Sequence, residues 1–405
     1  MRIYKALAVV LATALSVFLP FGVCANTVSS ECDISDINTP IASTGAAVQT
    51  GGTLDIKAKS AILLEPGTLE VLYEDNSDEK LPPASITKIM SLLLIMEAID
   101  RGDLAVDDVI NASAHAASMG GSQIWLKENE SMTVDDLLKA AVIASANDAT
   151  VALAEAVAGS EEEFVRRMNE KAKELGMSGT VFKNATGLDD KGHISTARDV
   201  AIMSAALIKY PLIKNYSTVW IDSLRDGKSE LVNTNKLVRF YKGTTGLKTG
   251  TTSGAGYCLA ATALRDGMEL VAVIMGGESS AARFEGAKKL LDYGFANYSF
   301  KEIKPEFKDG TKIAVTGGEE PEVALAAGEG LGILQKKSEQ GKTTQKINLK
   351  SSISAPVKAG DKVGEIEVFS GDGLIGTIDI TAKAGVKKMS IKTAFVWLLK
   401  GLLQS

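Results

Sequence analysis

The sequence of 405 residues contains little histidine, cysteine or aromatic side chain. Its two histidines, His115 and His193, stand in no cluster with cysteine and acidic residues, which argues against a His-based metal site. The formal net charge is −6, so the chain lacks the strongly basic surface that nucleic-acid binding requires. We therefore expect no metal, no organic cofactor and no nucleic-acid partner.

The three cysteines are too few for a disulfide framework. Cys24 lies in a segment that we expect to be removed, and Cys32 lies in a polar stretch. Cys258 lies within the apolar run GYCLAATAL, which predicts a small buried side chain. A single bridge between Cys32 and Cys258 stays open at this point.

Residues 1–25 have the pattern of a secretory signal peptide. Arg2 and Lys5 precede an apolar run over residues 6–18, and the small-residue cleavage site Val23-Cys24-Ala25 follows. We expect cleavage after Ala25 and export of the chain. An uncleaved membrane anchor is the alternative, and lipidation of Cys24 is disfavoured because the preceding valine is bulky.

A flexible arm rich in Ser, Thr, Asp and Gly is predicted over residues 26–53, and one α+β domain over residues 54–298. Strand patterns occur at both ends of this domain and helical spacing between them, which favours an antiparallel sheet covered by helices. The predicted elements are two strands around Pro66-Gly67, helices at 84–101, within 133–157 (two) and at 161–175, a helix capped by Ser195, strands from Thr245 with a hairpin turn at 265–267, and a helix at 280–296.

The composition changes after residue 298, and two further segments follow. Residues 299–384 alternate charged with β-branched residues and predict a small all-β domain. Residues 385–405 carry Phe395, Trp397 and several leucines between lysines, but their apolar run is shorter than the roughly 20 residues that span a bilayer. We expect an amphipathic helix that lies on a membrane surface; a helix docked on the protein itself is the alternative.

Three short motifs carry the chemistry. Ser85 and Lys88 form an S-x-x-K at the start of a helix, where residues three apart face the same side. Ser145-Ala146-Asn147 is an S-x-N between two helical runs, and Lys248-Thr249-Gly250 is a K-T-G at the start of a strand. Each motif alone is common by chance. Together, in this order and after a signal peptide, they are the signature of penicillin-binding proteins and class A β-lactamases.

The residue types suit acyl transfer. A serine hydroxyl needs a nearby base, and a lysine becomes one when burial or a second positive charge lowers its pKa. Lys248 and Thr249 would hold a carboxylate through charge and hydroxyl. Gly250 would let the strand backbone approach the substrate.

The chain resembles the D-alanyl-D-alanine carboxypeptidases, the low-molecular-mass penicillin-binding proteins of serine peptidase family S11, over nearly its whole length. The stretches that carry the resemblance are PASITKIM, ASANDATVALAE, FVRRMNEKAKELGMSGTVFKNATGLDDKGHISTARDVAIM, NTNKLV and GLKTGTTSGAGYCLAA. The resemblance implies the penicillin-binding/β-lactamase-like transpeptidase fold and an exported enzyme at the outer face of the cytoplasmic membrane. Its implied partners are peptidoglycan stem peptides ending in D-Ala-D-Ala, β-lactams as inhibitors, and the membrane surface through the C-terminal helix.

The same resemblance implies a role for each motif residue. Ser85 would be the nucleophile and Lys88 its general base, while Ser145 and Asn147 would relay a proton and orient the peptide. The terminal carboxylate would bind Lys248, Thr249 and Gly250. The oxyanion hole would be the backbone N–H groups of Ser85 and Thr251. Some relatives have histidine at the position of Thr251, so we expect the pH dependence of this chain to differ from theirs.

Other polar residues are expected to support the site without taking part in the chemistry. His193 is expected to be structural, Arg198 is a candidate neighbour of the site, and Gly120-Gly121-Ser122 is expected to line the cleft. Three alternatives stay open: a D,D-endopeptidase, a class A β-lactamase and an inactive wall-peptide-binding homologue. The β-lactamase is disfavoured because no E-x-x-x-N occurs between the second and third motifs.

Overall fold

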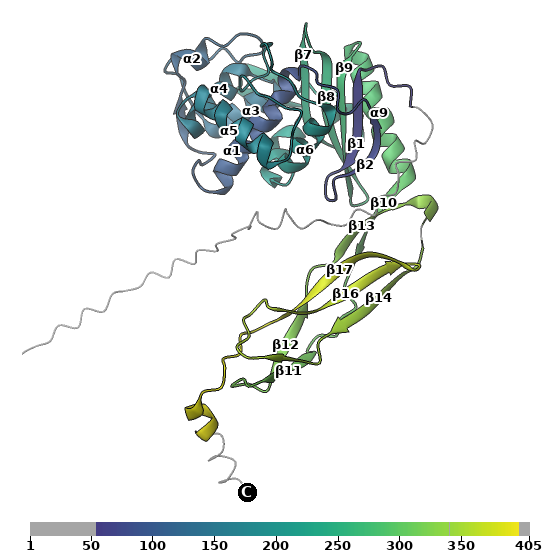
Figure 1. Ribbon diagram of the computed structural model, residues 1–405. Coiled ribbons are helices and arrows are strands. Elements are labelled where there is room, and N and C mark those ends of the chain that lie inside the picture. Colours follow the sequence, from purple (N-terminus) through teal and green to yellow (C-terminus); the bar gives the residue numbers. More distant parts are fainter. Residues whose placement is uncertain (1–53, 340, 397–405) are drawn as a thin grey trace, which may run out of the picture. The chain divides into compact units, whose positions relative to one another are not determined.

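The computed structural model describes residues 54–339 and 341–396 (Figure 1). The predicted signal peptide at 1–25, the predicted arm at 26–53 with Cys32, and residues 397–405 of the predicted C-terminal helix lie outside these residues. Within the described part, no helix is long and apolar enough to cross a membrane.

An antiparallel five-stranded sheet organises residues 54–297, with the strand order β2-β1-β9-β8-β7. Its central strands alternate between two cores: Ile62 and Leu64 point to one side, and Ala61 and Leu63 to the other. Because both faces are covered, every residue of β1 is buried. The strands are β1 (Ser60–Glu65), β2 (Glu70–Asp75), β7 (Thr244–Thr252), β8 (Gly256–Arg265) and β9 (Met268–Gly277).

Helix α9 (Ser280–Asn297) covers one face of this sheet, and the helices from η2 to α6 gather on the opposite face (Figure 1). The prediction of two helices split at Ser145–Asn147 is confirmed, since α3 ends at Ile143 and α4 begins at Asn147. The helices of this face are η2 (Ala84–Thr87), α1 (Lys88–Asp100), α2 (Ala114–Ala117), α3 (Val134–Ile143), α4 (Asn147–Ala158), α5 (Glu161–Glu174) and α6 (Ala197–Leu207).

The cap predicted for α6 is wrong by one residue. Thr196 is the N-cap, and its hydroxyl accepts the Asp199 N–H at 3.0 Å. The Ser195 hydroxyl instead hydrogen-bonds to Thr180 at 2.8 Å. Both hydroxyls suit a cap, so the sequence did not distinguish them. Short elements that were not predicted are β3 (Val109–Asn111), β4 (Ser131–Thr133), η3 (Pro211–Ile213), α7 (Lys214–Ser217), β5 (Ile221–Leu224), β6 (Ser229–Val232) and α8 (Leu237–Phe240).

The predicted second domain is all-β in the described residues from 298 to 382. Its own core is built from alternating residues such as Ile366 and Val368 of one strand and Ile378 and Ile380 of the next. One pair joins β10 (Tyr298–Ile303) to β13 (Leu331–Lys336), and six strands form a sheet of order β14-β16-β17-β12-β11-β15. These are β11 (Lys312–Thr316), β12 (Glu322–Ala327), β14 (Thr343–Leu349), β15 (Ser352–Ser354), β16 (Lys362–Ser370) and β17 (Gly373–Ala382), with η4 (Lys337–Glu339) between β13 and β14.

The helix predicted at 385–405 does not begin at residue 385. Val386 forms a bridge with Val357 and Lys388 one with Gly318, so this stretch is extended against the β domain. Helix is observed over residues 391–396, with Ile391 and Phe395 exposed, and the rest of the predicted helix lies outside the described residues. These two bridges explain why the helix starts later than predicted, because the backbone of residues 386–388 is already used in strand-type hydrogen bonds.

Candidate active site

Ser85 and Lys88 meet because the chain makes a 3₁₀ turn at this point. Ser85 lies within η2, and Lys88 is the first residue of α1. In a 3₁₀ helix residues three apart stack above one another. The Lys88 Nζ lies 3.1 Å from the Ser85 Oγ, with Ser85 half-buried and Lys88 fully buried. The predicted pair is therefore in hydrogen-bond contact.

The environment of Lys88 favours its neutral form. Burial, and then the positive charge of Lys248, hold the pKa of Lys88 well below its ordinary value, while Asp148 opposes them. The Lys88 Nζ donates to Asn147 Oδ1 at 2.5 Å and to the Thr186 carbonyl at 2.8 Å. A neutral amine has two hydrogens, and these two acceptors occupy both. Its lone pair is then left for the Ser85 hydroxyl, which is the arrangement a general base needs.

The Thr186 carbonyl is a partner that the sequence analysis missed. It belongs to the loop 184–187, which passes over the start of the nucleophile helix. A Cβ on Gly187, whose φ is +85°, would stand 1.9 Å from the Ala84 carbonyl oxygen, so only glycine fits there. The Asn184 side chain folds the loop by accepting the N–H groups of Thr186 at 3.2 Å and Gly187 at 2.7 Å. Backbone acceptors of this kind have no side-chain signature in a sequence.

The S-x-N motif lies at the break between α3 and α4. Ser145 is buried and has φ +64°. This left-handed conformation stops α3 from continuing and turns the chain toward the start of α4. Asn147 uses its Nδ2 to donate to the Gly120 carbonyl at 2.6 Å, and its backbone N–H donates to the Ser122 carbonyl at 2.7 Å. The predicted cleft loop 120–122 is thus attached directly to the second motif.

Asp148 extends this attachment and was not singled out from the sequence. Its carboxylate is fully buried and accepts the N–H groups of Ile124 at 3.1 Å and Leu126 at 3.0 Å. Four points of the segment 120–126 are therefore held by two consecutive residues of α4. A usable signal was the aspartate placed in the first turn of a predicted helix, where backbone N–H groups and carboxylates favour each other.

The K-T-G motif lies on β7, which packs against η2. A Cβ on Gly250 would stand 2.8 Å from the Ser85 nitrogen and 3.0 Å from the Ile86 nitrogen. Lys248 is fully buried, and burial, followed by the charge of Arg283, lowers its pKa to about 7. The Thr249 hydroxyl donates to Thr234 Oγ1 at 2.7 Å. This end of the site therefore combines a buried amine with hydroxyl groups, a combination that suits a carboxylate.

Arg283 of α9 holds the backbone of β7 and was also missed. Its Nη1 donates to the Gly250 carbonyl and the Thr251 hydroxyl, each at 2.9 Å, and to the Cys258 carbonyl at 3.2 Å. The predicted buried state of Cys258 is confirmed, and burial raises its thiol pKa to about 11. Its bridge to Cys32 stays untested, because Cys32 lies outside the described residues.

His193 makes structural contacts. The Lys183 N–H donates to its Nδ1 at 3.1 Å, so its Nε2 carries the proton and donates to Thr87 Oγ1 at 2.8 Å. Burial lowers the pKa of His193 to about 4, and the imidazole is therefore neutral at ordinary pH. This ring joins the loop before α6 to the turn that carries Ser85.

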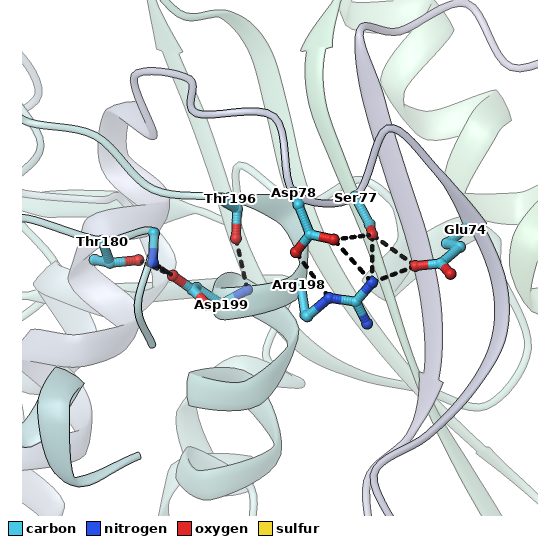
Figure 2. A network of polar contacts seen from close by, with 8 residues as sticks. Glu74, Ser77, Asp78, Thr180, Thr196, Arg198 and Asp199 are labelled. Carbon is cyan, nitrogen blue, oxygen red and sulfur yellow. Dashed lines mark hydrogen bonds and ion pairs between the residues drawn. The ribbon is translucent and has the colours of Figure 1, made fainter. Parts of the chain in front are cut away.

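Arg198 belongs to an ion-pair network and not to the set of residues around Lys88. Figure 2 shows its guanidinium between Asp78, Ser77 and Glu74. Its Nε donates to Asp78 Oδ1 at 2.8 Å, and its backbone N–H donates to the Ser77 carbonyl at 3.0 Å. In the same view, Asp199 accepts from Thr180. The network attaches the segment leading to Ser85 to the start of α6.

Comparison with known proteins gives matches over both domains. A family model described as D-alanyl-D-alanine carboxypeptidase matches residues 45–279, and a model of the penicillin-binding protein 5 C-terminal domain matches residues 300–388. D-alanyl-D-alanine carboxypeptidase DacF of Bacillus subtilis is 44% identical over 341 residues, which are 83% of this chain and 88% of that protein.

Two solved structures are similar in fold as well as in sequence. Penicillin-binding protein 5 from Haemophilus influenzae is 29% identical with a TM-score of 0.70, covering 84% of this chain and 100% of that one. Penicillin-binding protein D2 from Listeria monocytogenes in its ampicillin-bound form is 32% identical with a TM-score of 0.55, covering 60% and 100%. These matches confirm the predicted fold class: an α+β penicillin-binding domain followed by a small all-β domain.

Proposed function

The chain belongs to the D-alanyl-D-alanine carboxypeptidase family, and we propose that it removes the terminal D-alanine from peptidoglycan stem pentapeptides through an acyl-enzyme on Ser85. The observation that carries the proposal is the contact of Ser85 Oγ with a buried lysine whose two other partners are both acceptors. When both N–H groups of a neutral lysine are used by these acceptors, its lone pair can face only the Ser85 hydroxyl, which is the nucleophile.

In the proposed acylation, the Ser85 oxygen attacks the carbonyl between the two terminal D-alanines as its proton passes to Lys88 Nζ. The peptide C–N bond breaks, the leaving amine takes up a proton, and free D-alanine departs. Ser145, in the buried break before α4, would relay that proton, and Asn147 would orient the peptide amide. The backbone N–H groups of Ser85 and Thr251 would bind the oxyanion.

The terminal carboxylate would be held at the K-T-G end of the site. Protonated Lys248 would provide the charge, the Thr249 hydroxyl a hydrogen bond, and Gly250 the close approach of the strand. A water molecule would then hydrolyse the ester on Ser85, transferring its hydroxyl to the acyl carbon and its proton to the base. The ester C–O bond breaks, the base returns its proton to the Ser85 oxygen, and the peptide leaves one residue shorter.

We also propose that β-lactams acylate Ser85, because their amide carbonyl would occupy the same place as the scissile one. The ampicillin-bound relative from Listeria supports this reading. Fluorescent penicillin should label the wild type and fail to label Ser85→Ala. Labelling of Ser85→Ala at the wild-type rate would place the nucleophile elsewhere.

The family acts on peptidoglycan and therefore in the cell envelope. For this chain we propose export through residues 1–25 and attachment of the tail to the membrane surface. Support for attachment comes from the exposed Ile391 and Phe395 in the observed part of the tail helix. Deleting residues 391–405 should move the protein from the membrane to the soluble fraction of a fractionated cell; retention in the membrane fraction would contradict the proposal.

The deciding experiment measures D-alanine released from a pentapeptide ending in D-Ala-D-Ala, with wild type beside Ser85→Ala. Release by wild type alone establishes the carboxypeptidase. If folded wild type releases none, cross-linked peptide dimers become the next substrate, and their cleavage would establish an endopeptidase instead.

A further inference from the structure

Glu161, the first residue of α5, joins two segments that lie far apart in the sequence. Its Oε1 accepts the Ala185 N–H at 2.9 Å, and its Oε2 lies 2.7 Å from the His115 Nε2. The Glu161 side chain is 15% exposed, so its carboxylate is held mainly by these two partners. None of the three motifs includes Glu161 or either partner.

The first partner leads to one acceptor of the base. Ala185 is held on both sides, because Glu161 accepts its N–H and the Ser91 hydroxyl donates to its carbonyl at 2.6 Å. The next carbonyl along the chain is that of Thr186, which accepts from Lys88 Nζ. Holding Ala185 therefore fixes the residue before Thr186, and Asn184 holds the Gly187 N–H of the same peptide unit as the Thr186 carbonyl at 2.7 Å.

The second partner leads to the other acceptor. His115 lies in α2, which packs against α4, and five residues further on is Gly120. The Gly120 carbonyl accepts from Asn147 Nδ2, which leaves Asn147 Oδ1 turned toward Lys88 Nζ. The amide orientation of Asn147 therefore depends on the segment that carries His115.

We propose that Glu161 is a positioning residue for the acylation of Ser85. One of its oxygens holds the loop that supplies the Thr186 acceptor of Lys88, and the other holds the segment whose Gly120 carbonyl orients the Asn147 acceptor. The inference rests on the proposed role of Lys88 as general base. Without Glu161 the two acceptors lose their common anchor, and the amine lone pair is no longer confined to the direction of Ser85. The consequence falls on the chemical step and not on ligand binding, since Glu161 touches neither the nucleophile nor the K-T-G strand.

The test is stopped-flow acylation of the full chain by a fluorescent penicillin, which separates the binding constant from the acylation rate constant. Glu161→Ala should lower the acylation rate constant roughly 10- to 100-fold, the range that small misplacements of catalytic groups produce, with the binding constant unchanged. Glu161→Gln should recover most of the rate, because its amide oxygen still accepts the Ala185 N–H and its amide nitrogen can donate to the His115 Nε2 when the ring carries its proton on Nδ1. Glu162→Ala is the matched control, since Glu162 is an exposed carboxylate in the same helical turn.

An unchanged acylation rate constant in Glu161→Ala would overturn the proposal. An equal loss in Glu162→Ala would also overturn it, because the effect would then belong to helix charge. If Glu161→Ala does not fold, His115→Ala decides: a several-fold lower acylation rate constant supports the proposal, and a wild-type value overturns it. The proposed function is tested separately, by whether the wild type is acylated and releases D-alanine at all.

Discussion

Gly250 lies so close to the nucleophile that a Cβ on it would stand 2.8 Å from the Ser85 backbone nitrogen. That nitrogen is one of the two proposed oxyanion donors. The nearest neighbours of the added atom are two backbone nitrogens and the Ala84 Cβ, which do not move aside as the end of a flexible side chain would. The strand β7 and the turn η2 are therefore in the closest contact that their backbones allow.

Gly250→Ala should consequently impair acylation far more than stability. The methyl group would push β7 away from η2 and misplace an oxyanion donor, and loss of one such donor costs about 10²–10³ in rate. The measurement is the acylation rate constant with penicillin beside the midpoint of urea unfolding. Gly373→Ala, in strand β17 where an added Cβ meets only the Ser370 carbonyl oxygen at 3.6 Å, is a control for the general cost of replacing a strand glycine. A Gly250→Ala enzyme with wild-type acylation would contradict the close approach.

Lys248 should give the reaction an alkaline limit near neutral pH. Its pKa in the free enzyme is lowered to about 7, so the charged form that binds a carboxylate is lost as the pH rises through 7. Because kcat/KM reports groups of the free enzyme, its value for a peptide with a free carboxylate should fall above about pH 7. Lys248→Met should raise KM and remove this limb. A limb that persists unchanged in Lys248→Met would assign it to another group.

His193 should make stability depend on pH in the mildly acidic range. Its pKa is about 4 in the folded protein against an ordinary 6.5, so the unfolded chain binds an extra proton between these values. The free energy of unfolding should therefore decrease as the pH falls from about 6.5 to 4, by at most about 1.4 kcal/mol for each pH unit. Chemical unfolding at several pH values should show a smaller slope for His193→Gln. His115→Gln is the control, since His115 is half exposed, and an equal loss of slope there would contradict the assignment.

Arg198 should matter for folding and not for acylation. Its guanidinium bridges β2 and the segment before Ser85, as Figure 2 shows. Arg198→Ala should lower the free energy of unfolding by about 1–2 kcal/mol, because solvent screens the exposed Asp78 partner. Arg101→Ala removes a fully surface pair with Asp103 and should cost well under about 1 kcal/mol. An acylation rate constant lowered in the Arg198 variant at unchanged stability would place this residue in the site after all.

Elements that local sequence pattern determines are predicted correctly from the sequence. The three-residue spacing of Ser85 and Lys88 needs only one turn of helix, and the break at Ser145–Asn147 needs only a change of helix phase. The alternation of Ala61 and Ile62 between two cores follows from strand geometry. The family resemblance predicted that the three motifs form one site, which their spacing alone did not predict.

The missed partners are those that long-range packing supplies. The Thr186 carbonyl reaches Lys88 across 98 residues and Arg283 reaches Gly250 across 33, each through a backbone acceptor that any residue type would provide. The choice between Ser195 and Thr196 as a cap depends on which hydroxyl Thr180 occupies. The start of the tail helix depends on bridges from residues 386 and 388 to other parts of the β domain. No local pattern contains these contacts.

The pairing of β1 with β9 decides at which point in folding the three motifs can come together. Ala61 pairs with Ile274, so the wholly buried first strand has no partner on that side until more than two hundred further residues are available. Contacts between residues so far apart in sequence form slowly. Until they form, the apolar strand β1 stays exposed to solvent on that side. The K-T-G strand is joined to β1 only through β8 and β9. A chain interrupted between residues 252 and 268 therefore carries all three motifs and still lacks β9, the strand that joins the K-T-G strand to β1.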